Sequence, residues 1–135
     1  MPERQLYSMP VREEGEDCLT EDSNEATERF EVPRGMIVYY LRMLKRGPLW
    51  TAEETPEVER LQVAHLAYGQ KLRETGKAII NGPLLDNGDL RGVSILRASS
   101  LEEAQALSDN DPSVQAGRLV SELHPWMVHR GILPE

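Results

Sequence analysis

His65 is the residue of this sequence best suited to move a proton. It interrupts a helical stripe of apolar side chains that are spaced three and four residues apart. The stripe consists of Val58, Leu61, Tyr68 and Leu72. A histidine on such a face has two interpretations. It is a core histidine that is hydrogen-bonded to a backbone carbonyl, or it is a general acid–base in a pocket between this helix and a sheet.

A histidine that works as an acid–base needs a carboxylate to hold its tautomer and to stabilise its charged form. Asp111 is the candidate, because it lies at the end of the second predicted helix. It also precedes Pro112, so it is a good N-cap for a short helical turn. The residues alone favour the cap. Asp109 is the next carboxylate along this segment, and we expect it to be solvated.

Two aromatic residues have open interpretations, and other chemical motifs are absent. Tyr40 lies in an apolar run, which favours core packing beneath helices or in a subunit interface. Trp50 lies in a loop, where it covers a pocket or packs on the N-terminal segment. The sequence has no glycine-rich phosphate loop, no dinucleotide fingerprint, no HExxH and no cysteine pair. We therefore expect neither a metal site nor a cofactor.

The elements that would position these residues alternate between strands and helices. Strands are predicted at 36–44, 77–81, 90–98 and 118–124, and helices at 56–75 and 101–109. The turn Asp86-Asn87-Gly88-Asp89 joins the second and third strands as a hairpin. The order βαββαβ predicts an α+β ferredoxin-like fold, with a four-stranded antiparallel sheet and two helices on one face.

The first strand is apolar on both faces, so it needs a cover on each side. One face holds Ile37, Tyr39, Leu41 and Met43, and the other holds Met36, Val38 and Tyr40. Two helices can cover only one of them. We expect the face of Met36, Val38 and Tyr40 to pack against the sheet of a second copy, which predicts a homodimer packed sheet to sheet.

Composition and charge narrow the class of protein. The chain has 135 residues and a net charge of −8, which argues against nucleic-acid binding. Its longest stretch without a charged residue is the ten residues 61–70, too short to span a membrane. The single cysteine, Cys18, cannot form an internal disulfide, so we expect a cytoplasmic protein.

The acidity is concentrated at the N-terminus. Residues 1–33 hold ten acidic side chains and three arginines, or −7 of the chain's −8. We therefore divide the chain into an acidic leader at 1–34, a domain at 35–128 and a C-terminal tail at 129–135. The leader has too few apolar residues to fold alone, so we interpret it as a tail or a strap on the domain.

Four segments of the domain together resemble the YciI-like (YCII-related) domain family. They are LQVAHL at 61–66, GKAIINGPL at 76–84, SLEEA at 100–104 and DNDPSVQAG at 109–117. The resemblance implies a ferredoxin-like fold of the dimeric α/β-barrel group, which dimerises through its sheet. It implies a catalytic pair at His65 and Asp111, and a pocket bordered by Gly82 and Pro83. We also assign Tyr40, Trp50 and Tyr68 to this pocket. One branch of the family resembles enzymes that eliminate HCl from chlorinated hydroxyhydroquinones.

The sequence leads to one main functional hypothesis and two alternatives. The main one is a small lyase- or isomerase-type enzyme without a cofactor, in which His65 and Asp111 transfer a proton on a small cyclic or aromatic acid. The first alternative is a protein that binds a small metabolite in the same pocket without turnover. The second is an interaction module whose acidic leader docks on a basic partner.

Overall fold

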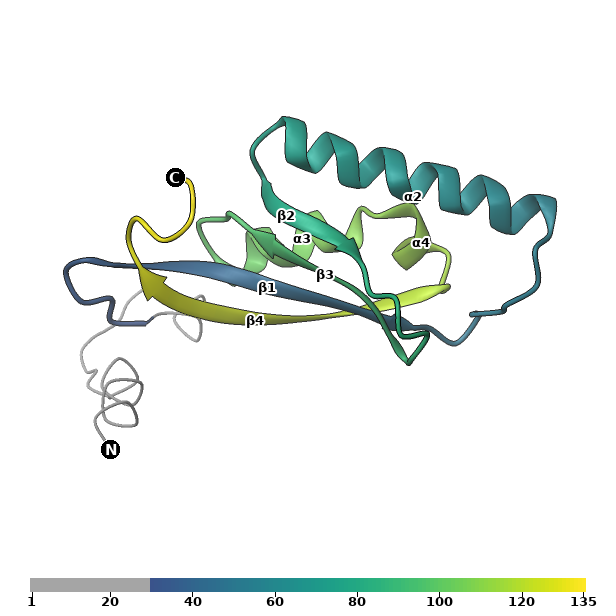
Figure 1. The fold of residues 1–135 in the computed structure, drawn as a ribbon, viewed down its shortest axis with the longest axis horizontal. Coiled ribbons are helices and arrows are strands. Elements are labelled where there is room, and N and C mark those ends of the chain that lie inside the picture. The colour runs from purple at the N-terminus through teal and green to yellow at the C-terminus, as the bar shows by residue number, and fades with distance from the viewer. Residues whose placement is uncertain (1–29) are drawn as a thin grey trace.

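A computed structural model describes residues 30–135, which form a single sheet with helices packed on one of its faces (Figure 1). The strands are β1 (Met36–Arg46), β2 (Ala78–Pro83), β3 (Leu90–Leu96) and β4 (Leu119–His129). The helices are α2 (Pro56–Glu74), α3 (Leu101–Asp109) and α4 (Pro112–Gln115). Most of the predicted leader, residues 1–29, lies outside the described residues.

The sheet has the strand order β2-β3-β1-β4, and every neighbouring pair is antiparallel. This confirms the predicted α+β ferredoxin-like arrangement. The hairpin between β2 and β3 turns at Asn87, whose φ of 58° is the left-handed backbone conformation that asparagine tolerates. No helix within residues 30–135 is long and apolar enough to cross a membrane.

The predicted ends of two strands were wrong for the same physical reason. We expected β2 to stop before Gly82-Pro83 and β4 to stop before Pro125, but β2 ends at Pro83 and β4 continues through Pro125 to His129. Both strands lie at edges of the sheet. Proline lacks a backbone N–H, and at an edge that position can face away from the neighbouring strand without breaking the ladder. The first strand also runs two residues further, and the third ends two residues earlier, than we predicted.

The prediction that Met36, Val38 and Tyr40 face a second copy was also wrong. Tyr40 packs in the core with Leu72 of α2 and Ala104 of α3, and Val38 packs against that cluster. The helices therefore cover the face of Val38 and Tyr40. The face without helices is that of Ile37, Tyr39, Leu41 and Met43, on which Tyr39 is nevertheless only 1% exposed. Alternation along a strand separates two faces but does not show which one the helices cover.

Helix α2 follows the local signals of its sequence. The side chain of Thr55 accepts a hydrogen bond from the Val58 amide at 3.1 Å, and Pro56 occupies the first turn. Gly69 lets the helix approach β2 closely, because a Cβ there would lie 3.3 Å from the side-chain nitrogen Nδ2 of Asn81. That nitrogen donates to the Gly69 carbonyl at 3.2 Å. This contact joins the middle of α2 to an edge strand beside His65.

Candidate active site

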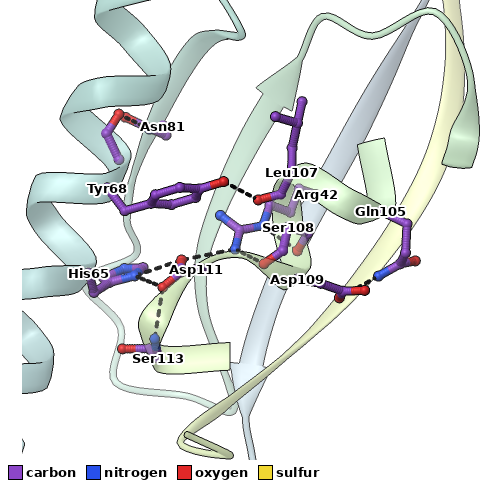
Figure 2. A network of polar contacts seen from close by, with 11 residues as sticks. Arg42, His65, Tyr68, Asn81, Gln105, Leu107, Ser108, Asp109, Asp111 and Ser113 are labelled. Atoms are coloured by element: carbon purple, nitrogen blue, oxygen red, sulfur yellow. Dashed lines mark hydrogen bonds and ion pairs between the residues drawn. The ribbon is translucent and has the colours of Figure 1, made fainter. Parts of the chain in front are cut away.

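The structure places His65 of α2 in contact with Asp111, 46 residues later in the chain (Figure 2). The ring nitrogen Nδ1 lies 2.9 Å from Oδ1 and 2.8 Å from Oδ2 of the carboxylate. Asp111 is 1% exposed and the His65 side chain is 21% exposed. The contact therefore joins a buried carboxylate to a histidine that still reaches solvent.

Asp111 is at the same time the N-cap of α4. Its Oδ1 accepts a hydrogen bond from the Ser113 amide at 2.9 Å. The two interpretations of Asp111, as a helix cap and as the partner of a histidine, are compatible, because an ionised carboxylate has two oxygens with several acceptor sites. The cap holds the carboxylate in place for the histidine.

Arg42 of β1 also contacts Asp111 and is part of the same polar network, as Figure 2 shows. Its guanidinium donates to Asp111 Oδ2 at 2.9 Å and to the hydroxyl of Ser108 at 2.7 Å. It also donates to the Ser108 carbonyl at 3.3 Å. Arg42 is 2% exposed and Ser108 is fully buried. The arginine fixes the carboxylate from the sheet side while His65 approaches it from the helix side.

The charged form of Asp111 is favoured in this setting. Burial by itself raises the pKa of the carboxyl group. The hydrogen bond and charge of His65, then Arg42 and the Ser113 amide, act in the opposite direction and leave the pKa below its ordinary value of 3.8. Asp111 is therefore an anion at neutral pH.

The anionic partner determines the tautomer of the histidine. An ionised carboxylate has no proton to donate, so His65 Nδ1 must carry the hydrogen of the contact. In the neutral ring, Nε2 is then the basic nitrogen. Among the described residues, none forms a hydrogen bond with Nε2. The site thus presents an oriented base.

His65 lines a cavity of about 580 Å³ between α2 and the sheet. The helix contributes His65 and Gly69, and the strands contribute Arg42, Ser94 and Asn81. This volume is in the range of pockets that hold small organic molecules. Within residues 30–135, no group of three or more His, Cys, Asp or Glu side chains is arranged to hold a metal ion.

The predicted pocket residues fall into two groups. Trp50, Gly82 and Pro83 line the cavity together with His65. Tyr40 is 4% exposed in the core, and Tyr68 donates its hydroxyl to the Leu107 carbonyl at 2.7 Å, bridging α2 and α3. Burial raises the pKa of Tyr68. Neither tyrosine is part of the cavity wall, so we leave both out of the proposed site.

Sequence reasoning missed Arg42, Ser108 and Ser113, which complete the network. Arg42 had a usable signal, because it is the one charged residue in the apolar run 36–44. A charge in such a run needs a partner when the strand is buried. The two serines carried no comparable signal, since serine is common at helix ends.

One known protein family matches most of the chain. Residues 38–126 match the YCII-related domain family. Among solved structures, the chain is similar to 5-chloro-2-hydroxyhydroquinone dehydrochlorinase from Burkholderia phenoliruptrix, in complex with 2,5-dihydroxybenzoquinone. That similarity has 27% identity and a TM-score of 0.49, and covers 67% of this chain and 93% of the other. No curated protein matches the chain. Because the family match covers most of the chain, including the strands and helices that hold His65 and Asp111, this protein belongs to the YCII-related domain family.

Proposed function

We propose that this protein is a small lyase- or isomerase-type enzyme in which His65 transfers a proton on a small cyclic or aromatic acid. The observation that carries the proposal is the 2.8 Å contact between His65 Nδ1 and the buried Asp111 carboxylate, at the wall of a cavity. A base of fixed tautomer at the wall of a cavity is the minimum arrangement for proton abstraction.

The proton transfer has a defined course in this geometry. Nε2 takes a proton from a carbon or hydroxyl of the bound molecule, and the ring becomes an imidazolium. The Asp111 carboxylate stabilises that positive charge through Nδ1. The electron pair left behind either expels a leaving group on the neighbouring carbon, giving elimination, or shifts a double bond and receives the proton back at another atom, giving isomerisation.

Asp111 and Arg42 are positioning residues in this proposal. Arg42 donates to Ser108 through Nε and to Ser108 and Asp111 through Nη2, so it holds the carboxylate, and we assign the acid–base role to His65. Preorganisation of this kind saves reorganisation energy during the reaction. The proposal therefore assigns the chemical step to one nitrogen atom, His65 Nε2.

The proposal is tested by proton exchange and turnover. The purified protein is incubated in D₂O with a panel of cyclic and aromatic acids and chlorinated hydroxyhydroquinones, and NMR follows deuterium incorporation and product formation. We expect at least one compound to exchange or react, and His65→Ala to abolish that activity while circular dichroism shows an intact fold.

His129 provides a matched control. It is an exposed histidine at the end of β4 and does not line the cavity. His129→Ala should retain full activity. If no compound exchanges or reacts but several bind, the protein is a metabolite-binding module and the enzymatic proposal is wrong.

We also propose that the protein works as a homodimer whose two sheets face each other. The face without helices exposes Ile80 at 59%, beside Ile95 and Leu41, and Trp126 at 44%. It also carries the exposed polar group of Lys45, Glu122 and His124. Large apolar side chains exposed in this way are unfavourable in water. A second copy of the chain would cover this face, because a two-fold interface joins the same surface patch of both subunits.

A further inference from the structure

Three guanidinium groups surround the ring of Trp50 at one end of the cavity. Arg118 lies 4.2 Å from the ring centroid, Arg91 lies 5.2 Å from it and Arg46 lies 5.5 Å from it. Arg118 directly precedes β4, Arg91 is at the start of β3 and Arg46 is at the end of β1. Because these strands are antiparallel, all three arginines lie at the same end of the sheet. The π-face of tryptophan attracts cations, but it does not cancel three positive charges.

The hydrogen bonds of these arginines go to neutral groups. Arg118 donates to the Thr51 carbonyl at 2.9 Å, and Arg91 donates to the Gly88 carbonyl at 3.1 Å. Arg46 donates to the carbonyl of Asn87 at 3.2 Å. None of the three forms an ion pair with a carboxylate among residues 30–135.

Clustered cations without counter-ions repel one another, and an anion bound among them relieves that repulsion. Arg91, Arg118 and Trp50 all line the cavity that contains His65. Arg73, whose hydrogen bond is to the Asn81 side chain, lines it as well. The carboxylates Glu54 and Glu59 also line the cavity, but both are exposed and neither pairs with an arginine.

The cationic end is separated from the proton-transfer end. Arg42, which holds Asp111, and Arg46, beside Trp50, are four residues apart on β1. This corresponds to about 13 Å along a strand. A molecule that reaches both ends therefore carries its negative charge on one side and its reacting atom on the other.

We propose that Arg91 and Arg118, stacked on Trp50, form the subsite for the anionic group of the ligand, a carboxylate or a phosphate on an aromatic or cyclic body. The guanidinium groups provide planar, paired donors suited to both oxyanions. The inference rests on the proposed function in placing the reacting end of the ligand at His65. The anion subsite itself depends only on the arginines and the cavity.

Binding of simple anions tests the subsite directly. Trp126 is replaced by Phe so that Trp50 is the remaining tryptophan, and Trp50 emission is followed while benzoate, phenyl phosphate, inorganic phosphate or neutral benzyl alcohol is added. We expect saturable changes with benzoate or phenyl phosphate, weakening as salt is added, and none with benzyl alcohol. Whichever of these two aromatic anions binds with the lower Kd identifies the anionic group of the ligand as a carboxylate or a phosphate.

Charge-removing variants locate the response. Arg118→Gln and Arg91→Gln, each made in the Trp126→Phe protein, should weaken anion binding by about tenfold or more, since a charge-assisted hydrogen bond is lost. Arg60→Gln removes the same charge from an exposed position on α2 outside the cavity and should leave binding unchanged. Equal weakening by Arg60→Gln, equal binding of benzyl alcohol, or a response to inorganic phosphate alone would overturn the proposal.

The same titration separates this inference from the proposed function. It measures binding, so it does not require His65 to move a proton. Anion binding that depends on Arg118, found together with an inactive compound panel, supports the subsite and contradicts the enzyme. Turnover that depends on His65, found together with no anion response at Trp50, supports the enzyme and contradicts the subsite.

Discussion

Arg42 and Asp111 form an ion pair of 2.9 Å in which the two side chains are only 3% and 1% exposed. A buried pair of this kind gains little over apolar packing, but losing one partner leaves a charge in the interior. Its position beside His65 indicates that the pair serves to hold the carboxylate in one orientation. The stability of the fold and the geometry of the candidate site therefore depend on the same contact.

Arg42→Met should destabilise the protein strongly. The substitution leaves Asp111 buried with His65 as its one remaining side-chain partner, and breaking a buried pair in this way costs about 3–5 kcal/mol of unfolding free energy. Urea denaturation measures this loss. Arg130→Met breaks the exposed ion pair with Glu135 and serves as the control, with an unfolding midpoint close to that of the wild type. Equal midpoints for all three proteins would show that the buried pair has no structural role.

Asp111→Asn should separate the two roles of this residue. Asparagine is a good N-cap and can still accept from the Ser113 amide. It cannot stabilise an imidazolium at His65, so turnover of an identified substrate should fall by about 10²-fold or more. Steady-state kinetics on the folded variant measures kcat. An unchanged kcat would mean that Asp111 is a helix cap only and that His65 is not assisted by it.

The acid stability of the fold should depend on Asp111. The pKa of this carboxyl in the folded protein is lower than its ordinary 3.8. As the pH falls below about 4, the unfolded chain binds a proton that the folded protein does not, so stability is lost down to the folded pKa. Acid unfolding of the wild type should therefore be steeper than that of Asp111→Asn. Glu103 and Glu122, whose pKa values are also lowered, contribute equally to both proteins. Parallel curves would contradict the role assigned to Asp111.

The proposed dimer predicts a face-specific effect of added charge. Sedimentation should give about twice the 15.3 kDa chain mass for the wild type. Ile95→Lys, on the face of the sheet without helices, should give a folded monomer, because a lysine there is desolvated against its own copy. Val63→Lys adds the same charge on α2, at a side chain that is 68% exposed, and should remain dimeric. A monomeric wild type would refute the interface.

Local signals in the sequence were sufficient to locate the starts of the two longer helices and the hairpin. The cap at Thr55-Pro56 marked the start of α2, Ser100 marked the start of α3 and the Asn87-Gly88 turn marked the β2–β3 hairpin. These features depend on backbone preferences and hydrogen bonds within a few residues, so they can be read from neighbours in the chain. The placement of His65 on the inner face of α2 followed from the same periodicity.

The network around His65 depended on contacts that sequence spacing does not encode. His65 and Asp111 are 46 residues apart, and Arg42 and Asp111 are 69 apart. Their meeting depends on which face of the sheet the helices cover, and the handedness of the crossover connections decides that face. The same handedness puts Tyr40 in the core and leaves Ile37 and Leu41 on the outside, the reverse of the expected assignment.

The sequence by itself determined a ferredoxin-like domain with a histidine on a buried helical stripe and an aspartate at a cap. Only the tertiary structure decided that this aspartate reaches the histidine, that Arg42 lies beneath it, and that three arginines meet at Trp50. Capping and periodicity are set by adjacent residues. Arg42 and Asp111 become partners only when the cap of α4 packs against the face of the sheet that carries Arg42, because no oppositely charged side chain lies near either of them in the sequence.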